Sequence, residues 1–129
     1  FNEEAAVSDW KIKKKENKYK KNENMFKQIK FRENKDILYM ISNLKKNRPK
    51  IVCGFAAETN CLINNARNKL INKNCDLIFA NKISQKFNPM ANNFNKISVI
   101  GRNNLKNWRK MTKKKIAEKI IREISTYLN

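Results

Sequence analysis

The chain has 129 residues, and its 30 Lys and Arg against 11 Asp and Glu give a net charge of +19, with no histidine. This length suits one domain with one modest core, and the charge favours polyanionic partners such as nucleoside triphosphates, nucleic acid or anionic lipid. The lack of histidine excludes a Ser-His-Asp triad, a Cys-His dyad and any zinc site built on imidazole.

The N-terminal third predicts strands, a loop and a helix. Residues 5–10 indicate the end of a strand, and the lysine-rich residues 11–21 predict a mobile loop. Apolar residues alternate with lysines over 25–32, a pattern typical of a half-buried strand. Helical spacing of apolar residues begins at Ile37 and stops before Pro49, which predicts a short helix.

The middle of the chain predicts a helix between two strands. Residues 50–55 predict a short strand. Apolar spacing predicts a helix over 58–73, with Thr59 or Asn60 as its N-cap. The nearly continuous apolar run at 75–80 is typical of a strand buried on both faces.

The C-terminal third predicts a polar loop over 81–95, a strand over 96–100, and turns over 101–107. Thr112 is expected to cap a final helix. The residues expected to face inward from that helix are Ile116, Ile120, Ile121, Ile124 and Leu128. Strands and helices that alternate in this way predict an α/β layered sheet.

The cysteines and the hydropathy pattern indicate a cytoplasmic protein. Cys53, Cys61 and Cys75 form no C-x-x-C pair and are typical of reduced thiols, mostly in the core. The sequence contains no apolar run of membrane-spanning length and no visible signal peptide, so no membrane partner is expected.

The segment Gly54–Asn60 is the first candidate ligand site. It follows an apolar run, so we expect it at the carboxyl end of a strand, where open α/β sheets bind ligands. The small residues around Phe55 would let a ligand approach the backbone closely. The sequence has neither a G-x-x-x-x-G-K-[ST] loop nor a G-x-G-x-x-G loop, so neither standard phosphate cradle is expected.

Without histidine, the available chemistry is cationic. Three features stand out: the lysine run that starts at Lys11, the pair Lys69 and Lys73 at i and i+4 on one predicted helix face, and Asp9 at the end of the first strand. Lysines near strand ends neutralise a triphosphate and the charge that develops as it breaks. The alternative is that these lysines are ordinary solvated surfaces, and the pattern alone does not decide.

Five segments, in order along nearly the whole chain, resemble phosphopantothenate–cysteine ligase, the synthetase domain of the bifunctional coenzyme A biosynthesis flavoprotein. Ala5–Trp10 is similar to its A-A-V-[SA]-D-[WY] segment and Lys11–Lys14 to its K-I-K-K flap. Gly54–Thr59 is similar to its G-F-A-A-E-T motif. Ala66–Lys73 resembles its A-R-x-K-x-x-x-K helix, and Asp76–Asn81 resembles D-L-I-x-A-N.

The resemblance implies a three-layer Rossmann-like α/β sheet with flanking helices. Residues 1–129 would form the C-terminal part of the synthetase domain, without its N-terminal half, and residues 11–21 would form a mobile flap. Bacterial ligases of this family use CTP to activate 4′-phosphopantothenate as an acyl-cytidylate, from which cysteine displaces CMP to form an amide. A homodimer is implied, with Mg²⁺ bridging phosphate oxygens and no FMN in this part.

The resemblance also implies roles for individual residues. Lys11 and Lys69 would be catalytic. The residues that would contact the nucleotide are Asp9, Lys11, Lys35, Asp36, Ile37, Leu38, Phe55, Lys69 and Lys73. No residues are expected to form a metal site of their own. A separately encoded N-terminal half or decarboxylase would be a further partner.

Two other readings remain open at the level of sequence. The first is a basic nucleic-acid-binding module that stacks bases on Trp10, Tyr19, Phe94 or Trp108, although the lysines are dispersed and no nucleic-acid-binding motif is present. The second is a docking or dimerisation fragment without catalytic activity.

Overall fold

The computed structural model describes residues 10–12, 31–33, 35–83 and 93–129. The chain divides into two units, residues 1–37 and residues 38–129. In the first unit, β1 (Trp10–Ile12) pairs antiparallel with β2 (Phe31–Glu33), and Lys11 lies opposite Arg32. The prediction of a loop over residues 11–21 is therefore wrong for Lys11 and Ile12, which lie in strand β1.

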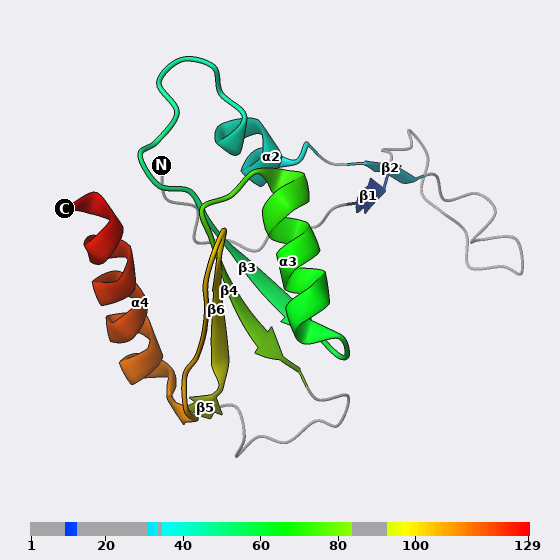
Figure 1. The fold of residues 1–129 in the computed structure, drawn as a ribbon. Helices are drawn as coiled ribbons and strands as arrows, with labels where there is room; N and C mark the ends of the chain where they lie inside the picture. Colours follow the sequence, from blue (N-terminus) through cyan, green and yellow to red (C-terminus); the bar gives the residue numbers. More distant parts are fainter. Residues whose placement is uncertain (1–9, 13–30, 34, 84–92) are drawn as a thin grey trace, which may run out of the picture. The chain divides into compact units, whose positions relative to one another are not determined.

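The second unit contains a four-stranded mixed sheet in the order β3-β4-β6-β7 (Figure 1). Strands β3 (Cys53–Glu58) and β4 (Leu77–Lys82) run parallel, because α3 (Leu62–Lys73) returns the chain between them. Strands β6 (Ile97–Gly101) and β7 (Leu105–Asn107) add an antiparallel hairpin.

Three short elements complete the second unit. The helix α2 (Ile37–Ser42) begins at the unit boundary and precedes β3. Strand β5 (Phe94–Asn95) pairs antiparallel with β8 (Met111–Thr112), which leads directly into α4 (Lys113–Leu128). None of the helices in the described ranges is both long and apolar enough to cross a membrane.

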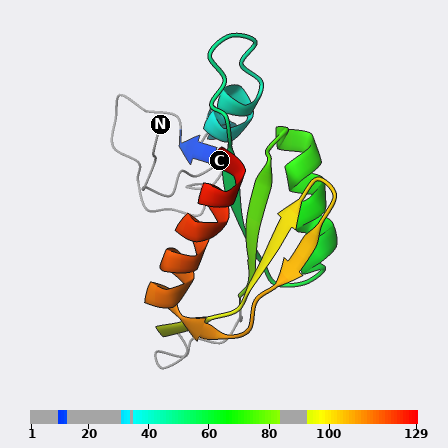
Figure 2. The same ribbon diagram turned by 60° about the vertical axis from the view of Figure 1, so that its left-hand side comes forward.

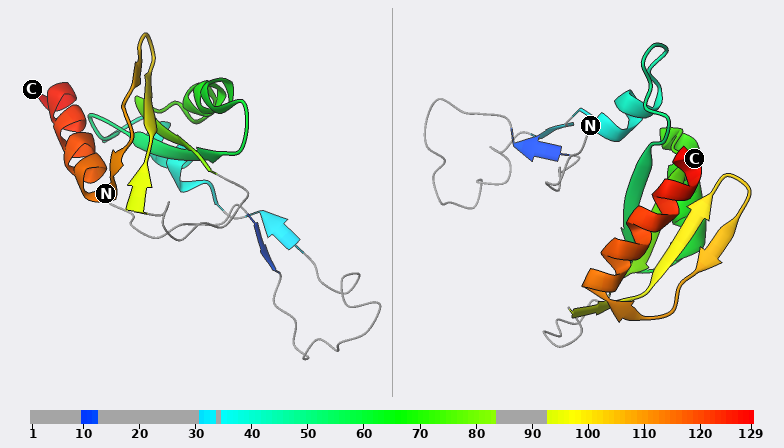
Figure 3. Two further views of the ribbon diagram at one scale, coloured as in Figure 1. Left: turned by 90° about the horizontal axis from the view of Figure 1, so that it is seen from below. Right: turned by 90° about the vertical axis from the view of Figure 1, so that its left-hand side faces the viewer.

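The sheet lies between two helical layers, with α3 on one face and α4 on the other (Figures 2 and 3). On the α3 face, the buried core consists of Ala56, Ala66, Leu70, Cys75, Ile78, Ala80 and Ile100. On the α4 face, it consists of Leu77, Phe79, Ile97, Val99, Trp108 and Ile116. The predicted α/β fold with flanking helices is confirmed, and so is a β4 buried on both faces.

The loop between α2 and β3 is held by one arginine. The Arg48 guanidinium pairs with the Asp76 carboxylate at 3.1 Å and also donates to the carbonyl oxygens of Ser42 and Asn74. The same Asp76 oxygen accepts the Val52 main-chain N–H at 2.7 Å. This clip fixes the start of β3 next to the start of β4, and we expect it to serve stability.

Several predicted boundaries are wrong. The helix predicted from Glu58 begins at Leu62, because β3 continues to Glu58 and Cys61 takes a left-handed conformation at the N-cap without a side-chain cap. Turns predicted over 101–107 include strand β7, and the loop predicted over 81–95 contains the end of β4 and all of β5.

The α4 expectations are partly correct. Thr112 is the N-cap, and its hydroxyl oxygen accepts the Lys115 main-chain N–H at 3.3 Å. Ile116 is buried, and Ile120 and Ile124 pack against the core. Ile121 and Leu128, however, are exposed, because the sheet covers only one side of the helix.

Candidate functional site

Phe55 lies near the middle of β3, and its side chain is on the α4 face of the sheet, at a position that α4 does not cover. Its side chain is 62% exposed, whereas Gly54 and Ala56 on either side of it are buried under α3. The Phe55 ring lies 5.7 Å from the ring of Phe79, which in turn lies 6.0 Å from Trp108. Two buried aromatic side chains therefore support an exposed ring from below.

Lys69 approaches the same strand from α3. Its ammonium nitrogen donates a hydrogen bond of 2.5 Å to the main-chain carbonyl oxygen of Phe55. In the described part of the sheet, β3 is an edge strand, so this carbonyl has no strand partner on its outer side. A carbonyl holds the ammonium in place without neutralising its charge, which leaves the cation available to an anionic ligand.

Gly54 is required here by close packing, since its backbone φ is not positive. A Cβ at this position would lie 2.8 Å from Ile78 Cδ1 and 2.9 Å from Leu38 Cδ2. Leu38 of α2 therefore packs directly on the strand residue that precedes Phe55. The structure thus brings together Leu38, Phe55 and Lys69 from the predicted set.

Lys73 lies one turn beyond Lys69 on α3, half-buried at the last position of the helix. Its carbonyl oxygen accepts a hydrogen bond of 3.4 Å from the Asn43 side chain, so the end of α3 is tied to the segment after α2. A cation in the last helical turn is also favoured by the helix dipole. Lys69 and Lys73 do share one helix side, as their spacing predicts.

The remaining predicted site residues belong to the first unit. Lys35, Asp36 and Ile37 directly precede Leu38 in the chain, and Lys35 is exposed. Lys11 is in β1, and only its backbone is described. Asp9 lies outside the described residues. The structure does not place these five residues relative to Phe55 and Lys69.

The described residues near this site provide neither a metal cluster nor a reactive Cys53 thiol. Within the described ranges, no group of three or more Cys, Asp or Glu side chains gathers to hold a metal ion. An accompanying Mg²⁺ would therefore need most of its oxygen ligands from nucleotide phosphates and water. Burial, and to a lesser extent the charge of Asp76 and the nearby Cys75, raise the pKa of Cys53 to about 12, so this thiol is not a nucleophile at neutral pH.

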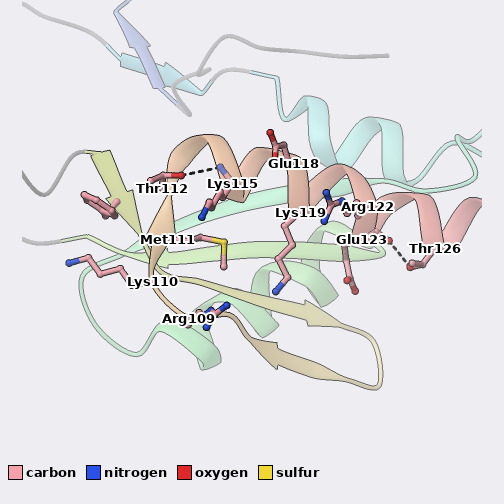
Figure 4. Close-up of a pocket in the computed structure, with 11 residues that line it drawn as sticks. Arg109, Lys110, Met111, Thr112, Lys115, Glu118, Lys119, Arg122, Glu123 and Thr126 are labelled. Carbon is pink, nitrogen blue, oxygen red and sulfur yellow. Dashed lines mark hydrogen bonds between the residues drawn. The ribbon is translucent and has the colours of Figure 1, made fainter.

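A second feature was not predicted from the sequence as a site. A groove of about 800 Å³ runs between α4 and the segment that leads into β8 (Figure 4). Its cationic lining residues are Arg109, Lys110, Lys115, Lys119 and Arg122. The signal in the sequence is the spacing of Lys115, Lys119 and Arg122 at i, i+4 and i+7, which places them on one helix side. Trp108, predicted to be available for stacking, is buried beneath Lys119.

The fold defines a three-layer α/β domain with a mixed sheet and a lysine held at the edge of a strand. The chain belongs to the DNA/pantothenate metabolism flavoprotein C-terminal domain family, which it matches over residues 2–128. The resemblance predicted from the sequence motifs is therefore confirmed.

Relatives and solved structures agree with this assignment. The chain is 36% identical over 120 residues to the coenzyme A biosynthesis bifunctional protein CoaBC of Borreliella burgdorferi, covering 92% of this chain and 30% of that protein. It is 36% identical over 123 residues to CoaBC of Haemophilus influenzae, covering 93% of this chain and 30% of that protein. A crystal structure of the C-terminal domain of CoaBC matches with a TM-score of 0.61 and 27% identity, over 78% of this chain and 45% of that one.

Proposed function

We propose that this chain supplies the nucleotide-binding part of a CTP-dependent ligase that joins 4′-phosphopantothenate to cysteine in coenzyme A biosynthesis. Family membership and the coenzyme A biosynthesis proteins among its relatives support this assignment. The observation that carries it is the hydrogen bond from Lys69 to the main-chain carbonyl of Phe55, which places a cation at the backbone of the residue whose aromatic ring is exposed.

Phe55 would contact the nucleotide. Its ring is exposed and rests on Phe79, which is fully buried and packs against Trp108. An aromatic side chain supported in this way loses little conformational entropy when a planar ligand packs on it. A rigid strand also positions such a contact better than a loop does.

Lys69 and Lys73 would hold the triphosphate. They are one turn apart, about 6 Å along the helix axis. The carboxylate of 4′-phosphopantothenate attacks the α-phosphorus of CTP, and the bond to pyrophosphate breaks. The ammonium of Lys69 would stabilise the charge that develops on this leaving group. The amino group of cysteine then attacks the acyl carbon of the cytidylate, and CMP leaves with the electron pair of the broken C–O bond.

The other residues implied by the resemblance complete the proposal. Lys11 would reach the phosphates from the flap and Asp9 would contact the nucleotide, while residues 35–38 would form a further nucleotide-contacting turn. Mg²⁺, when bound with CTP, would offset phosphate charge. The chain spans 30% of the length of the CoaBC relatives cited above, so the remaining part of the acyl-substrate site would come from outside these 129 residues. A homodimer is part of the same proposal.

The test compares two substitutions on α3. Lys69→Met keeps the aliphatic stem but removes the charge that is hydrogen-bonded to the Phe55 carbonyl, whereas Arg67→Met removes a charge from an exposed position two residues earlier. Ligand binding raises the melting temperature, with about 2.7 kcal/mol of stabilisation at a hundredfold excess over Kd. We expect CTP with Mg²⁺ to protect the wild-type chain and Arg67→Met, and to protect Lys69→Met much less. Equal protection of all three, or none in the wild type, would contradict the proposal.

A further inference from the structure

We propose that the groove beside α4 binds a segment of single-stranded nucleic acid. This site goes beyond the proposed ligase function and shares no residue with it. The groove is lined by α4 on one side and by Arg109, Lys110 and Met111 on the other (Figure 4), and Phe94 of β5 is also a lining residue. Its volume of about 800 Å³ is within the usual range for ligand sites.

The charge of the groove favours an anionic occupant. Five cationic side chains line it, against the two carboxylates of Glu118 and Glu123. Glu123 is already paired with Lys106 at 2.7 Å, a contact that raises the pKa of the lysine. Glu118 remains as a carboxylate that would repel an anion, so cations outnumber it along the groove. Within the described ranges, no carboxylate lies at ion-pair distance from Arg109, Lys115 or Arg122.

Two of the lysines are positioned by aromatic rings. The ammonium of Lys119 lies 4.9 Å from the centroid of the Trp108 ring, and that of Lys110 lies 5.9 Å from the centroid of Phe94. A ring attracts a cation through its quadrupole but carries no net charge to neutralise it. These contacts therefore hold two cations in the groove and leave their charges available to an anion.

The arrangement of the cations on both walls suits a ligand with repeated negative charges. Lys115, Lys119 and Arg122 follow one side of α4 over about 10 Å of its axis. Arg109 and Lys110 face them from the segment before β8. A strand with a phosphate on every nucleotide can contact both rows.

The aromatic ring of Phe94 in the lining of the groove favours nucleic acid over an acidic peptide. Phe94 is 47% exposed and lies beside these cations. Single-stranded nucleic acid is bound in general by a positive groove together with aromatic side chains on which bases stack. A carboxylate-rich peptide would use the cations but gain little from the ring.

The experiment compares two pairs of substitutions that remove the same charge. The double variant Lys115→Gln and Arg122→Gln removes two positive charges from the groove. The double variant Lys45→Gln and Lys46→Gln removes two exposed positive charges outside it. A fluorescent oligothymidylate is titrated against each chain at several salt concentrations. We expect the groove variant to bind roughly tenfold more weakly and to make the negative slope of log K against log salt less steep by about 1.4. The control variant should change neither the affinity nor the slope much.

Further arms identify the ligand. Phe94→Leu should weaken oligothymidylate several-fold and inorganic polyphosphate much less, because both ligands lose the ring that positions Lys110 but only the nucleotide loses a stacking partner for its base. Lys69→Met should leave oligonucleotide binding unchanged, which separates this site from the proposed CTP site. Equal losses in the two charge pairs, no measurable binding, or polyglutamate competing as well as the oligonucleotide would each overturn the proposal. Displacement of the oligonucleotide by CTP in the Lys69→Met chain would also overturn it, since the groove would then be a mononucleotide site.

Discussion

The ammonium group of Lys69 is held by the main-chain carbonyl of Phe55, across the gap between α3 and the edge of β3. This contact joins the two residues on which the proposed nucleotide site depends. A carboxylate partner would have neutralised the charge of the lysine. A backbone partner fixes its position and leaves its charge.

The contact between the rings of Phe55 and Phe79 gives the first prediction. Phe55→Leu should change the free energy of unfolding little, because the side chain is largely exposed, but should weaken CTP binding. Phe79→Leu is the matched substitution on the neighbouring strand β4. It should lower the free energy of unfolding by about 1–2 kcal/mol, because this ring is fully buried. Urea unfolding and CTP titration on both variants measure the two effects. A Phe55→Leu chain that binds CTP normally would remove the ring from the site.

Gly54 gives the second prediction. Gly54→Ala should destabilise the chain by about 1–3 kcal/mol, because the new Cβ meets Ile78 and Leu38 at distances that require one of them to move. The control is Ala57→Ser on the same strand, where the side chain is exposed and the change should be small. Urea midpoints compare them. An unchanged midpoint for Gly54→Ala would mean that Leu38 moves aside without cost.

How far the sequence predicted the fold depends on which interactions set each element. The apolar stripes of α3 and α4 and the continuous run of β4 are local patterns, so these elements were predicted correctly. The end of β3 is not predicted by a local pattern, because Glu58 is extended through its pairing with Lys82, a residue distant in sequence. Strand β7 was missed for the same reason: its three residues are exposed and are defined only by pairing with β6.

The candidate site shows the same division. The motifs indicate that Phe55 and Lys69 belong to one nucleotide site, but no sequence pattern shows that the Lys69 ammonium meets the Phe55 carbonyl oxygen. The cations of the α4 groove are close in sequence, between residues 109 and 122, but Phe94 joins them only through the pairing of β5 with β8. Trp108 was expected to be exposed, yet it is buried, because it fills the α4 side of the sheet.

The clip around Arg48 gives the third prediction. Arg48→Met should cost about 1–3 kcal/mol, because it leaves the Asp76 carboxylate without its ion pair and removes donors from the carbonyls of Ser42 and Asn74. Lys45→Met, an exposed charge in the same loop, is the control. Thermal and urea unfolding measure both. Equal midpoints would show that water replaces the arginine at no cost.

The thiols give the fourth prediction. At pH 8, Cys61 should react quickly with a maleimide, since it is exposed, whereas the half-buried Cys53 should react slowly and the buried Cys75 only as the chain unfolds. Burial is the main cause that raises the pKa of both protected thiols, to about 12 for Cys53. Raising the pH from 8 to 10 should therefore leave Cys53 protected in the folded chain. Mass spectrometry of timed samples counts the labels, and fast labelling of Cys53 would contradict its raised pKa.

The same shift in Cys53 also sets the direction of a pH effect on stability. The folded pKa lies above the ordinary value of 9.0, so the unfolded chain loses the proton first. The stabilisation from the neutral buried thiol is fully present below about pH 9 and declines as the pH rises toward 12. Cys53→Ala should flatten this part of the stability curve.

The first turn of α4 gives the last prediction. It contains Lys113, Lys114 and Lys115 and no acidic residue, although the N-terminus of a helix favours negative charge. Lys114→Glu should therefore stabilise the chain by about 0.5–1 kcal/mol at low salt, and the gain should shrink as salt screens it. Because the net charge is +19, any such change also relieves general repulsion. Lys46→Glu makes the same charge change outside a helix, so the difference between the two urea midpoints isolates the dipole contribution, and equal midpoints would assign the whole gain to net charge.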